Sequence, residues 1–339
     1  MPAALLQADK SFQIQDTESI APAEGQVRLE VAFCGVCGTD LHIFKGHMDR
    51  RVAFPEVIGH EASATVAEVG PGVTSVEPGD AVVVRPLDAC GDCAACRKGF
   101  GHVCTNLNFI GIDSPGAFQG SWTVPAGLVH ELPGGLDLKM AAFVEPLAVA
   151  CHDVRMAGLR AGEAAVVLGG GPIGMLIAMV ARATGAEVIL SEVNPKRLEL
   201  ARTLGVAGVN PVSEDVPAFV KEHNGGELAD VVFEVSGAAP AIAQMTHLAC
   251  VRGRVVVVAI VPEPAKVDLF QVFWKELKII GTRVYEPQDY DRAIAMLADG
   301  SIDPSPLVTG EYPLTRVDEA FDSLSNSPDH MKILIDCRG

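Results

Sequence analysis

Residues 164–174 read AAVVLGGGPIG, an apolar run that passes directly into a glycine-rich turn. The apolar run predicts a short buried strand, and the residues after the turn predict a helix that ends at Gly185. Gly169, Gly171 and Gly174 have the spacing of a dinucleotide-binding turn. The first glycine permits the tight turn, the second admits a pyrophosphate, and the third lets helix and strand pack closely.

The residues around this turn predict which dinucleotide binds. Pro172 and Ile173 open the helix, whose free N–H groups and positive dipole end favour phosphate. Glu192 follows the next predicted strand, where an acidic residue accepts hydrogen bonds from ribose hydroxyls and repels a 2′-phosphate. NAD is therefore predicted. Arg197 is assigned to the same site and keeps NADP as an alternative, because a nearby arginine can accommodate the extra phosphate.

Strands and helices alternate through the middle of the chain, which predicts parallel βαβ units and a doubly wound sheet. The predicted strands are residues 165–168, 188–191, 231–235, 254–260 and 279–281, with helices at 173–184, 195–204 and 240–249. Ile260, at the end of the fourth of these strands, is a further candidate for contact with the cofactor.

The flanking regions have a different pattern. Residues 27–33 and 82–84 predict strands in a glycine- and proline-punctuated, β-rich first half. Two helices at 288–298 and 317–325 and a strand at 332–336 follow the alternating region. This tail is too short for a domain of its own, so we expect it to pack onto the first half. The dinucleotide-binding region is then an insertion.

Four cysteines, with two, two and seven residues between them, lie in one glycine- and charge-rich stretch. Such spacing lets four thiolates meet one tetrahedral Zn²⁺, and a site closed by four sulfurs has no open position for a substrate. We therefore expect a structural zinc. Its predicted ligands are Cys90, Cys93, Cys96 and Cys104.

A second metal site is expected elsewhere, because catalytic zinc takes three protein ligands and keeps one position open. Cys37 lies in the stretch CGTDLH at 37–42, and His60 lies in GHE at 59–61. Together with a carboxylate they would meet this need. Glu145 opens the run EPLAVA at the entry to the alternating region.

These motifs, in this order along the whole chain, resemble the zinc-dependent medium-chain dehydrogenases of the alcohol dehydrogenase superfamily. The resemblance implies an α/β fold with a GroES-like, β-rich catalytic domain and an inserted Rossmann domain. The implied boundaries are 1–148 for the catalytic domain with its zinc lobe at 88–106, 149–283 for the NAD-binding domain, and 284–339 for the returning segment.

The resemblance also implies roles for individual residues. Cys37, His60 and Glu61 would hold the catalytic zinc, with Glu145 close enough to coordinate or exchange. Thr39 would begin a proton relay that His42 completes. Glu61 gives the site an extra negative charge, which should weaken the pull of the metal on an alkoxide. Exchange of the metal between the two carboxylates and the substrate is one hypothesis for how this charge is compensated.

The implied reaction is oxidation of a secondary alcohol, of the sorbitol or 2,3-butanediol dehydrogenase type, to a ketone, with two zinc ions per chain and NAD. L-Threonine 3-dehydrogenase is an alternative activity. A zinc- and NAD-binding scaffold without turnover is an alternative of another class. Related enzymes are dimers or tetramers, so the resemblance implies a homo-oligomer.

The charge and composition of the chain indicate which partners it can bind and in which cellular compartment it is expected. The net charge of −17 argues against nucleic acid, whose phosphates it would repel. The uncharged run 164–181 is interrupted in its middle by Gly169, Gly170, Gly171 and Pro172, which favours a strand, turn and helix over a membrane span. No signal peptide is visible, and we expect a cytoplasmic protein whose cysteines are metal ligands or buried apolar groups.

Overall fold

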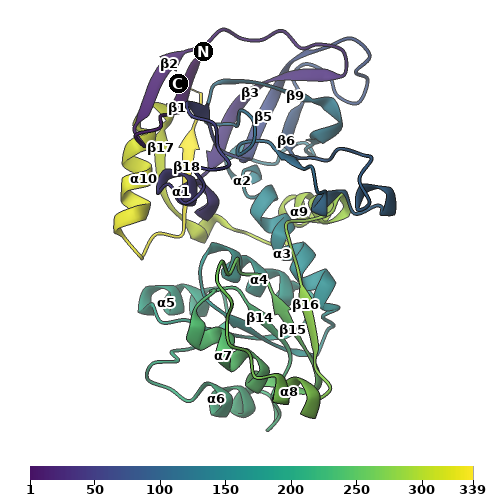
Figure 1. Ribbon diagram of the computed structural model, residues 1–339, viewed down its shortest axis with the longest axis vertical. Helices are drawn as coiled ribbons and strands as arrows, with labels where there is room; N and C mark the ends of the chain where they lie inside the picture. Colours follow the sequence, from purple (N-terminus) through teal and green to yellow (C-terminus); the bar gives the residue numbers. More distant parts are fainter. Residues whose placement is uncertain (339) are drawn as a thin grey trace. The chain divides into compact units, whose positions relative to one another are not determined.

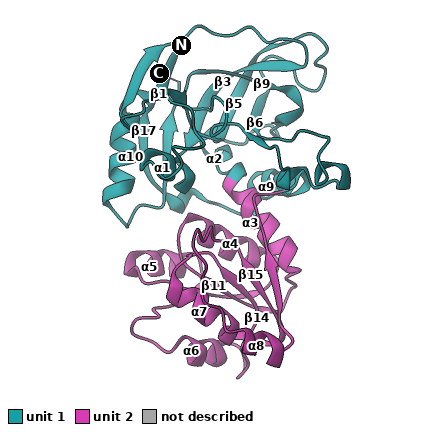
Figure 2. Cartoon of the chain, viewed as in Figure 1, with its two compact units in different colours: residues 1–145, 286–339 teal, residues 146–285 magenta. Residues whose placement is uncertain are grey.

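The computed structural model describes residues 1–338, which divide into two compact units. Unit 1 holds residues 1–145 and the segment from 286 onward, and unit 2 holds Pro146–Tyr285, as Figure 2 shows in two colours. The chain thus leaves unit 1, completes unit 2 and returns, which is the inserted arrangement expected from the sequence. Among residues 1–338, no helix combines the length and apolar character that crossing a membrane requires.

Unit 2 is built on six parallel strands in the order β13-β12-β11-β14-β15-β16. The strands are β11 (Ala164–Leu168), β12 (Glu187–Ser191), β13 (Ala207–Val209), β14 (Ala229–Glu234), β15 (Ala249–Val257) and β16 (Lys278–Gly281). The chain begins in the middle of the sheet and winds outward in both directions, which is the doubly wound order of dinucleotide-binding folds. The predicted Rossmann fold is confirmed.

Helices connect these strands. They are α3 (Val144–Ala157), α4 (Pro172–Ala183), α5 (Pro195–Thr203), α6 (Val216–His223), α7 (Ala239–Leu248) and α8 (Leu269–Trp274). Apolar residues on successive strands, such as Val166, Val232 and Val255, are fully buried in one core cluster with side chains of α6 and α7. Because strands buried on both faces need no alternation, they read as continuous apolar runs in the sequence.

Unit 1 is β-rich and holds the expected GroES-like part of the fold. Its strands are β1 (Pro2–Leu6), β2 (Phe12–Asp16), β3 (Gln26–Gly35), β4 (Glu56–Val57), β5 (Glu61–Val69), β6 (Ala81–Val84), β7 (Leu87–Asp88), β8 (Asn108–Phe109), β9 (Ser121–Pro125), β10 (Val129–Glu131), β17 (Val308–Pro313) and β18 (Lys332–Asp336). Its helices are α1 (Gly38–Phe44), α2 (Leu138–Ala141), α9 (Pro287–Ala298) and α10 (Val317–Asn326).

The main sheet of unit 1 joins the two ends of the chain. Its order is β10-β6-β5-β3-β18-β17, so β3 lies between β5 from the first half and β18 from the C-terminal segment. Strand β9 also pairs with β3, and all three partners of β3 run antiparallel to it. In Figure 1, β18 is the yellow arrow drawn beside the purple strands of the N-terminal half. The returning segment therefore completes a sheet that the first half begins.

Some elements differ from the sequence-based expectation. The strand predicted at 254–260 ends at Val257, so Ile260 lies in the loop that follows. Helix α3 was not predicted, because its apolar residues surround the axis and leave little amphipathic pattern. Strands β1, β2 and β17 were also missed, since a strand of five or six residues carries a weak periodic signal.

Candidate functional site

The four clustered cysteines of unit 1 bring their sulfur atoms together. The Sγ–Sγ distances are 3.4 Å for Cys93–Cys96, 3.8 Å for Cys93–Cys104 and 3.4 Å for Cys104–Cys90. Four thiolates about 2.3 Å from one zinc ion lie about 3.8 Å from one another. The donor set therefore fits a tetrahedral zinc ion.

The backbone around these sulfurs favours thiolates. The Cys96 N–H donates to Cys93 Sγ at 3.4 Å, and the Asn106 N–H donates to Cys104 Sγ at 3.3 Å. Donation from the backbone of Cys96 and Thr105 lowers the pKa of Cys93 to about 5. Desolvation and the neighbouring sulfurs raise the pKa of Cys96 to about 12. A set of thiols that cannot all ionise together without a cation is the expected state of a metal-binding cluster.

A second group of metal donors lies at one end of β3 and β5. Cys37 follows β3 and caps the N-terminus of α1, while His60 and Glu61 lie at the start of β5. One donor atom from each of the three residues lies within 4.8 Å of the other two. His60 is 2% and Glu61 1% exposed. A half-buried thiol that converges with a buried imidazole and a buried carboxylate suits a zinc ion that keeps a position open.

The Asp40 carboxylate contacts two of these three residues, Cys37 and His60. One carboxylate oxygen of Asp40 accepts the Cys37 N–H at 2.8 Å, and the other lies 3.5 Å from His60 Nδ1. Among the described residues, neither that oxygen nor His60 Nδ1 has another hydrogen-bond partner, although both are buried. Burial opposes a charged imidazole, yet Asp40 and Cys37 raise the pKa of His60 well above its usual value. A carboxylate facing Nδ1 leaves Nε2 as the metal donor.

A buried cation at this site was not predicted from the sequence. Lys332 Nζ lies 2.7 Å and 2.6 Å from the two carboxylate oxygens of Glu61, and Lys332 is 3% exposed. Desolvation alone would lower the pKa of Lys332, but Glu61 and Cys37 raise it above the usual lysine value. The lysine is therefore charged at neutral pH. The only sequence signal was a charged residue at the head of the apolar strand 332–336.

The remaining candidates of unit 1 lie around these donors. Glu145 is 5% exposed at the start of α3 and interacts electrostatically with Lys332 and with Tyr290. Within residues 1–338, the group of three converging donors does not include Glu145. The Phe109 ring packs edge-on against His60, with ring centroids 5.3 Å apart. Phe109 therefore forms an apolar wall beside the imidazole.

The residues predicted for the proton relay lie on α1. Thr39 is half-buried in the first turn, and His42 is exposed one turn later. The Nδ1 atoms of His42 and His47 are 3.1 Å apart. Partial burial and the nearby His47 and Lys45 lower the pKa of His42. His42 is therefore neutral at neutral pH and able to accept a proton.

The glycine-rich turn of unit 2 has the geometry that its sequence predicts. Gly169 has a φ of +107°, and a Cβ at Gly174 would overlap the Gly169 carbonyl oxygen. A Cβ at Gly171 would meet no protein atom within 4 Å. Two glycines are thus required by the turn itself, whereas Gly171 leaves space for a ligand at the start of α4. Pro172 and Ile173 form the first turn of that helix.

Glu192 lies beside this turn at the end of β12 and is 7% exposed. Its carboxylate accepts the N–H groups of Gly170, Val193 and Asn194 at 2.7, 2.7 and 2.8 Å. Arg197 on α5 lies 3.8 Å from the same carboxylate. Ile260 is 86% exposed in the loop after β15. Glu192 is therefore fixed by the backbone with its negative charge next to the phosphate-binding turn.

Replacing Glu192 by alanine should shift the cofactor preference of the chain from NAD toward NADP. The change removes a negative charge and frees three N–H groups beside Arg197, a combination that binds a 2′-phosphate. The ratio of kcat/KM for NAD to that for NADP should fall about tenfold or more. Glu199→Ala, at an exposed position on the same helix, is the matched control and should leave the ratio unchanged. An unchanged ratio in Glu192→Ala would contradict the assignment.

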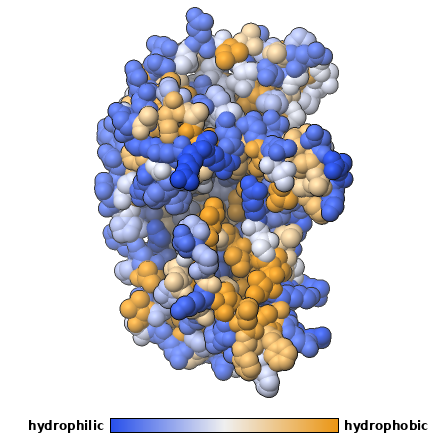
Figure 3. Space-filling view, viewed as in Figure 1, coloured by the Kyte–Doolittle hydropathy of each residue, from blue (hydrophilic) through white to orange (hydrophobic). Residues whose placement is uncertain are grey.

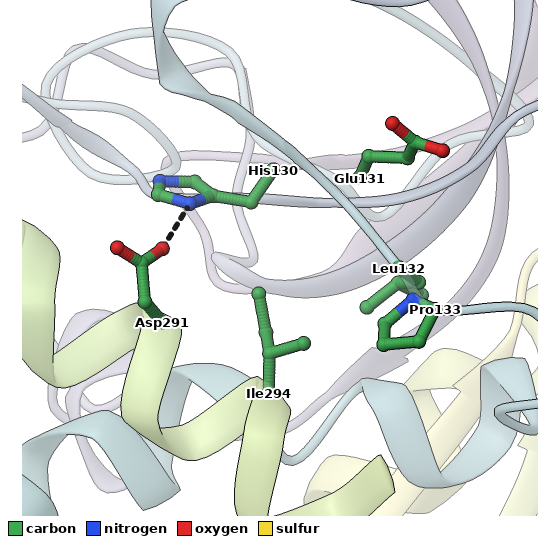
Figure 4. A pocket seen from close by; sticks show the side chains of 6 residues that line it. All are labelled: His130, Glu131, Leu132, Pro133, Asp291 and Ile294. Atoms are coloured by element: carbon green, nitrogen blue, oxygen red, sulfur yellow. Dashed lines mark hydrogen bonds and ion pairs between the residues drawn. The ribbon is translucent and has the colours of Figure 1, made fainter.

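A separate pocket of about 350 Å³ lies on unit 1 (Figure 4). His130, from β10, donates a hydrogen bond from Nδ1 to Asp291 Oδ1 of α9 at 3.1 Å, and Ile294 projects from the same helix. The other lining residues are Glu131, Leu132 and Pro133. None of the candidate metal ligands lines this pocket.

Comparison with known proteins gives matches along the whole chain. Residues 23–134 match the model of the alcohol dehydrogenase GroES-like domain, and residues 172–299 match that of the zinc-binding dehydrogenases. A 2-dehydro-3-deoxy-L-galactonate 5-dehydrogenase of Pseudoalteromonas atlantica is 53% identical over 337 residues, 99% of each chain. A sorbitol dehydrogenase of Halalkalibacterium halodurans is 32% identical over 96% of this chain and 95% of its own.

Solved structures show the same fold. The crystal structure of an alcohol dehydrogenase from Escherichia coli CFT073, complexed with the cofactor NADH, superposes with a TM-score of 0.92. The two chains are 27% identical, and the match covers 99% of each. The glycine-rich turn and the two metal-donor groups therefore belong to a fold that is known to bind a nicotinamide dinucleotide.

Proposed function

Since this chain belongs to the zinc-dependent medium-chain dehydrogenases of the alcohol dehydrogenase superfamily, we propose that it oxidises a secondary alcohol of a sugar acid to a ketone. Zinc and a nicotinamide dinucleotide are the cofactors of such an enzyme. The main support for a sugar acid as substrate is the 53% identity, over 99% of both chains, to a sugar-acid 5-dehydrogenase. Sorbitol, the substrate of a more distant relative, is a polyhydroxy compound of related chemistry.

The residues of unit 1 would act on the alcohol as follows. Cys37, His60 and Glu61 would hold the catalytic zinc, which supplies a Lewis acid that lowers the pKa of an alcohol. The Thr39 hydroxyl would accept the alcohol proton and pass it on, and His42 would deliver it to water. A bound NAD⁺ would supply the acceptor for the hydride that leaves the carbon bearing the hydroxyl. One alcohol and one NAD⁺ thus give one ketone, one NADH and one proton.

The four-cysteine cluster has a different role in this proposal. Its sulfurs would enclose a second zinc ion completely, so that ion would hold the loop at 88–106 in place and take no part in the reaction. We therefore expect two zinc ions per chain.

A screen of NADH formation tests the proposed substrate. The purified holoenzyme is assayed with 2-dehydro-3-deoxy-L-galactonate, L-galactonate, sorbitol, 2,3-butanediol and L-threonine. A sugar acid should give a kcat/KM about a hundredfold above the best of the other compounds, because a site with polar groups for several hydroxyls discriminates strongly against analogues that lack them. A preference for threonine would favour the alternative activity. No turnover of any compound by a chain that holds two zinc ions would favour a scaffold.

We further propose that the chain forms a homo-oligomer in the cytoplasm through the edge of the unit 2 sheet. Strand β16 has no partner beyond β15 among the described residues, and Figure 3 shows apolar surface gathered near it. The exposed apolar side chains of this region are Val251, Leu269, Phe270, Phe273, Trp274 and Ile279. A second copy, related by a twofold axis, would pair its own β16 with this edge and bury these side chains.

Light scattering tests the oligomer. The wild-type chain should have a mass that is a multiple of 35.6 kDa, and Phe273→Glu should lower it. Val212→Glu places the same charge on an equally exposed apolar residue away from this surface and should not change the mass. A monomeric wild-type protein would exclude the proposal.

A further inference from the structure

We propose that Lys332 is a positioning residue for the catalytic metal. Lys332 shares the Glu61 carboxylate with the metal and offsets the negative charge of this ligand. The inference rests on the proposed function in one respect, namely that Cys37, His60 and Glu61 are the metal ligands. Lys332 lies 271 residues from Glu61 in the sequence, and no motif connects the two.

The geometry of the pair is specific. Lys332 Nζ donates to both oxygens of Glu61, at 2.7 and 2.6 Å, and also to the Val36 carbonyl oxygen at 3.3 Å. Lys332 and Glu61 are 3% and 1% exposed. Because water does not screen such a pair, the lysine competes directly with a metal ion for the electrons of the carboxylate.

The sheet is built so that the two side chains can meet. Glu61 on β5 pairs with Gly35 on β3, and Gly35 pairs in turn with Leu334 on β18, two residues after Lys332. Lys332 and Leu334 lie on the same face of β18, because side chains alternate along a strand. A Cβ at Gly35 would overlap Glu61 Oε2. Glycine in the middle strand therefore leaves the space in which the carboxylate meets the ammonium.

The charges explain why an enzyme would need this pair. A zinc ion with one thiolate and one carboxylate ligand has no net charge, and the nearby Glu145 adds a negative charge if it is ionised. An electron-rich metal lowers the pKa of an alcohol less effectively. The Lys332 ammonium offsets one negative charge and weakens Glu61 as a donor. The site then keeps its electrophilic character and can release Glu61 when substrate binds.

The test compares Lys332→Met, Lys332→Gln and Lys332→Arg in the zinc holoenzyme and in the cobalt-substituted enzyme. Two measurements need no substrate: the rate at which a chromophoric chelator removes the catalytic metal, and the cobalt absorption spectrum. Lys332→Met and Lys332→Gln, which lose the charge, should release the metal about tenfold more slowly and should change the cobalt spectrum, because Glu61 then binds the metal more closely. Both variants should lower kcat more than they change KM. Lys332→Arg should resemble the wild type in all three.

A double-mutant cycle separates action through Glu61 from a distant charge effect. Glu61→Gln and the double variant Glu61→Gln with Lys332→Met should release metal at rates within about threefold of each other, because the lysine then has no carboxylate to share. An equal effect of Lys332→Met in the wild-type and in the Glu61→Gln background would overturn the inference, and so would an unchanged cobalt spectrum. Lys332→Gln is shorter and uncharged but keeps a hydrogen-bond donor, and it provides the same test if Lys332→Met does not fold.

These outcomes are distinct from those of the substrate screen. A variant that releases metal normally while the wild type oxidises a sugar acid would refute the role of Lys332 alone. Altered metal release in an enzyme that oxidises none of the screened compounds would refute the proposed function alone.

Discussion

Cys37→Ser should lose the catalytic zinc and fall about 10³-fold in NADH formation, since a loss of about 4 kcal/mol of Lewis-acid stabilisation corresponds to that factor. Cys37 is one of three donors that converge within 4.8 Å, and a serine hydroxyl is a much weaker ligand for zinc than a thiolate. The variant should hold one zinc ion per chain in place of two. Metal analysis and initial rates measure both quantities.

The fold should survive this change. Cys37 is half-buried at the start of α1, where its backbone N–H donates to the Asp40 carboxylate at 2.8 Å, and a serine side chain can cap the helix in the same position. The thermal unfolding midpoint should therefore stay close to that of the wild type. Cys250→Ser, at a half-buried thiol in unit 2, is the matched control and should keep both zinc ions and full activity. Full activity in Cys37→Ser would refute the catalytic metal site.

Cys104→Ser should have the opposite effect to Cys37→Ser. It should unfold the segment around the cysteine cluster but leave the catalytic zinc bound. Residues 88–106 contain one buried side chain, that of Cys104, so this segment has almost no apolar core of its own. A structural zinc contributes about 10 kcal/mol or more to small metal-dependent folds, and the described contacts offer no substitute here. The segment should unfold locally while the glycine-rich turn and the catalytic donors stay in place.

Limited proteolysis detects this local unfolding. New cleavage should fall within 88–106, at a rate about a hundredfold above the wild type if local stability falls by about 3 kcal/mol. One zinc ion per chain should remain, bound at Cys37 and His60. Cleavage that is no faster than in the wild type would show that the cysteine cluster does not hold the segment. Cys250→Ser again serves as the control.

The sequence predicted the elements whose pattern is local. The strand at 332–336 has the bounds of β18, and the helix at 195–204 differs from α5 by one residue, because proline near the start and glycine after the end mark it clearly. The cysteine spacing and the glycine spacing likewise depend on a few consecutive residues. Such signals can be read without knowledge of the tertiary fold.

Contacts between distant segments could not be predicted in this way. The pairing of Lys332 with Glu61 depends on the register of three strands, and a shift of one residue would turn either side chain to the other face. The position of Asp40 beside His60 depends similarly on where the fold places α1 relative to the residue that precedes β5. The sequence predicted that Glu61 adds a negative charge to the metal site. It gave no indication that Lys332 lies beside Glu61, because that contact depends on the tertiary fold.

The return of the chain into its first unit has a consequence for biosynthesis. A ribosome finishes Cys37, His60 and Glu61 long before it reaches Lys332, and the whole of unit 2 is made in between. Until the last strand emerges, the nascent polypeptide has a metal-binding carboxylate without its cationic partner. Maturation of the proposed metal centre would thereby depend on synthesis of the last strand, and a chain that ends before Lys332 would hold the proposed zinc ligands without the balancing charge.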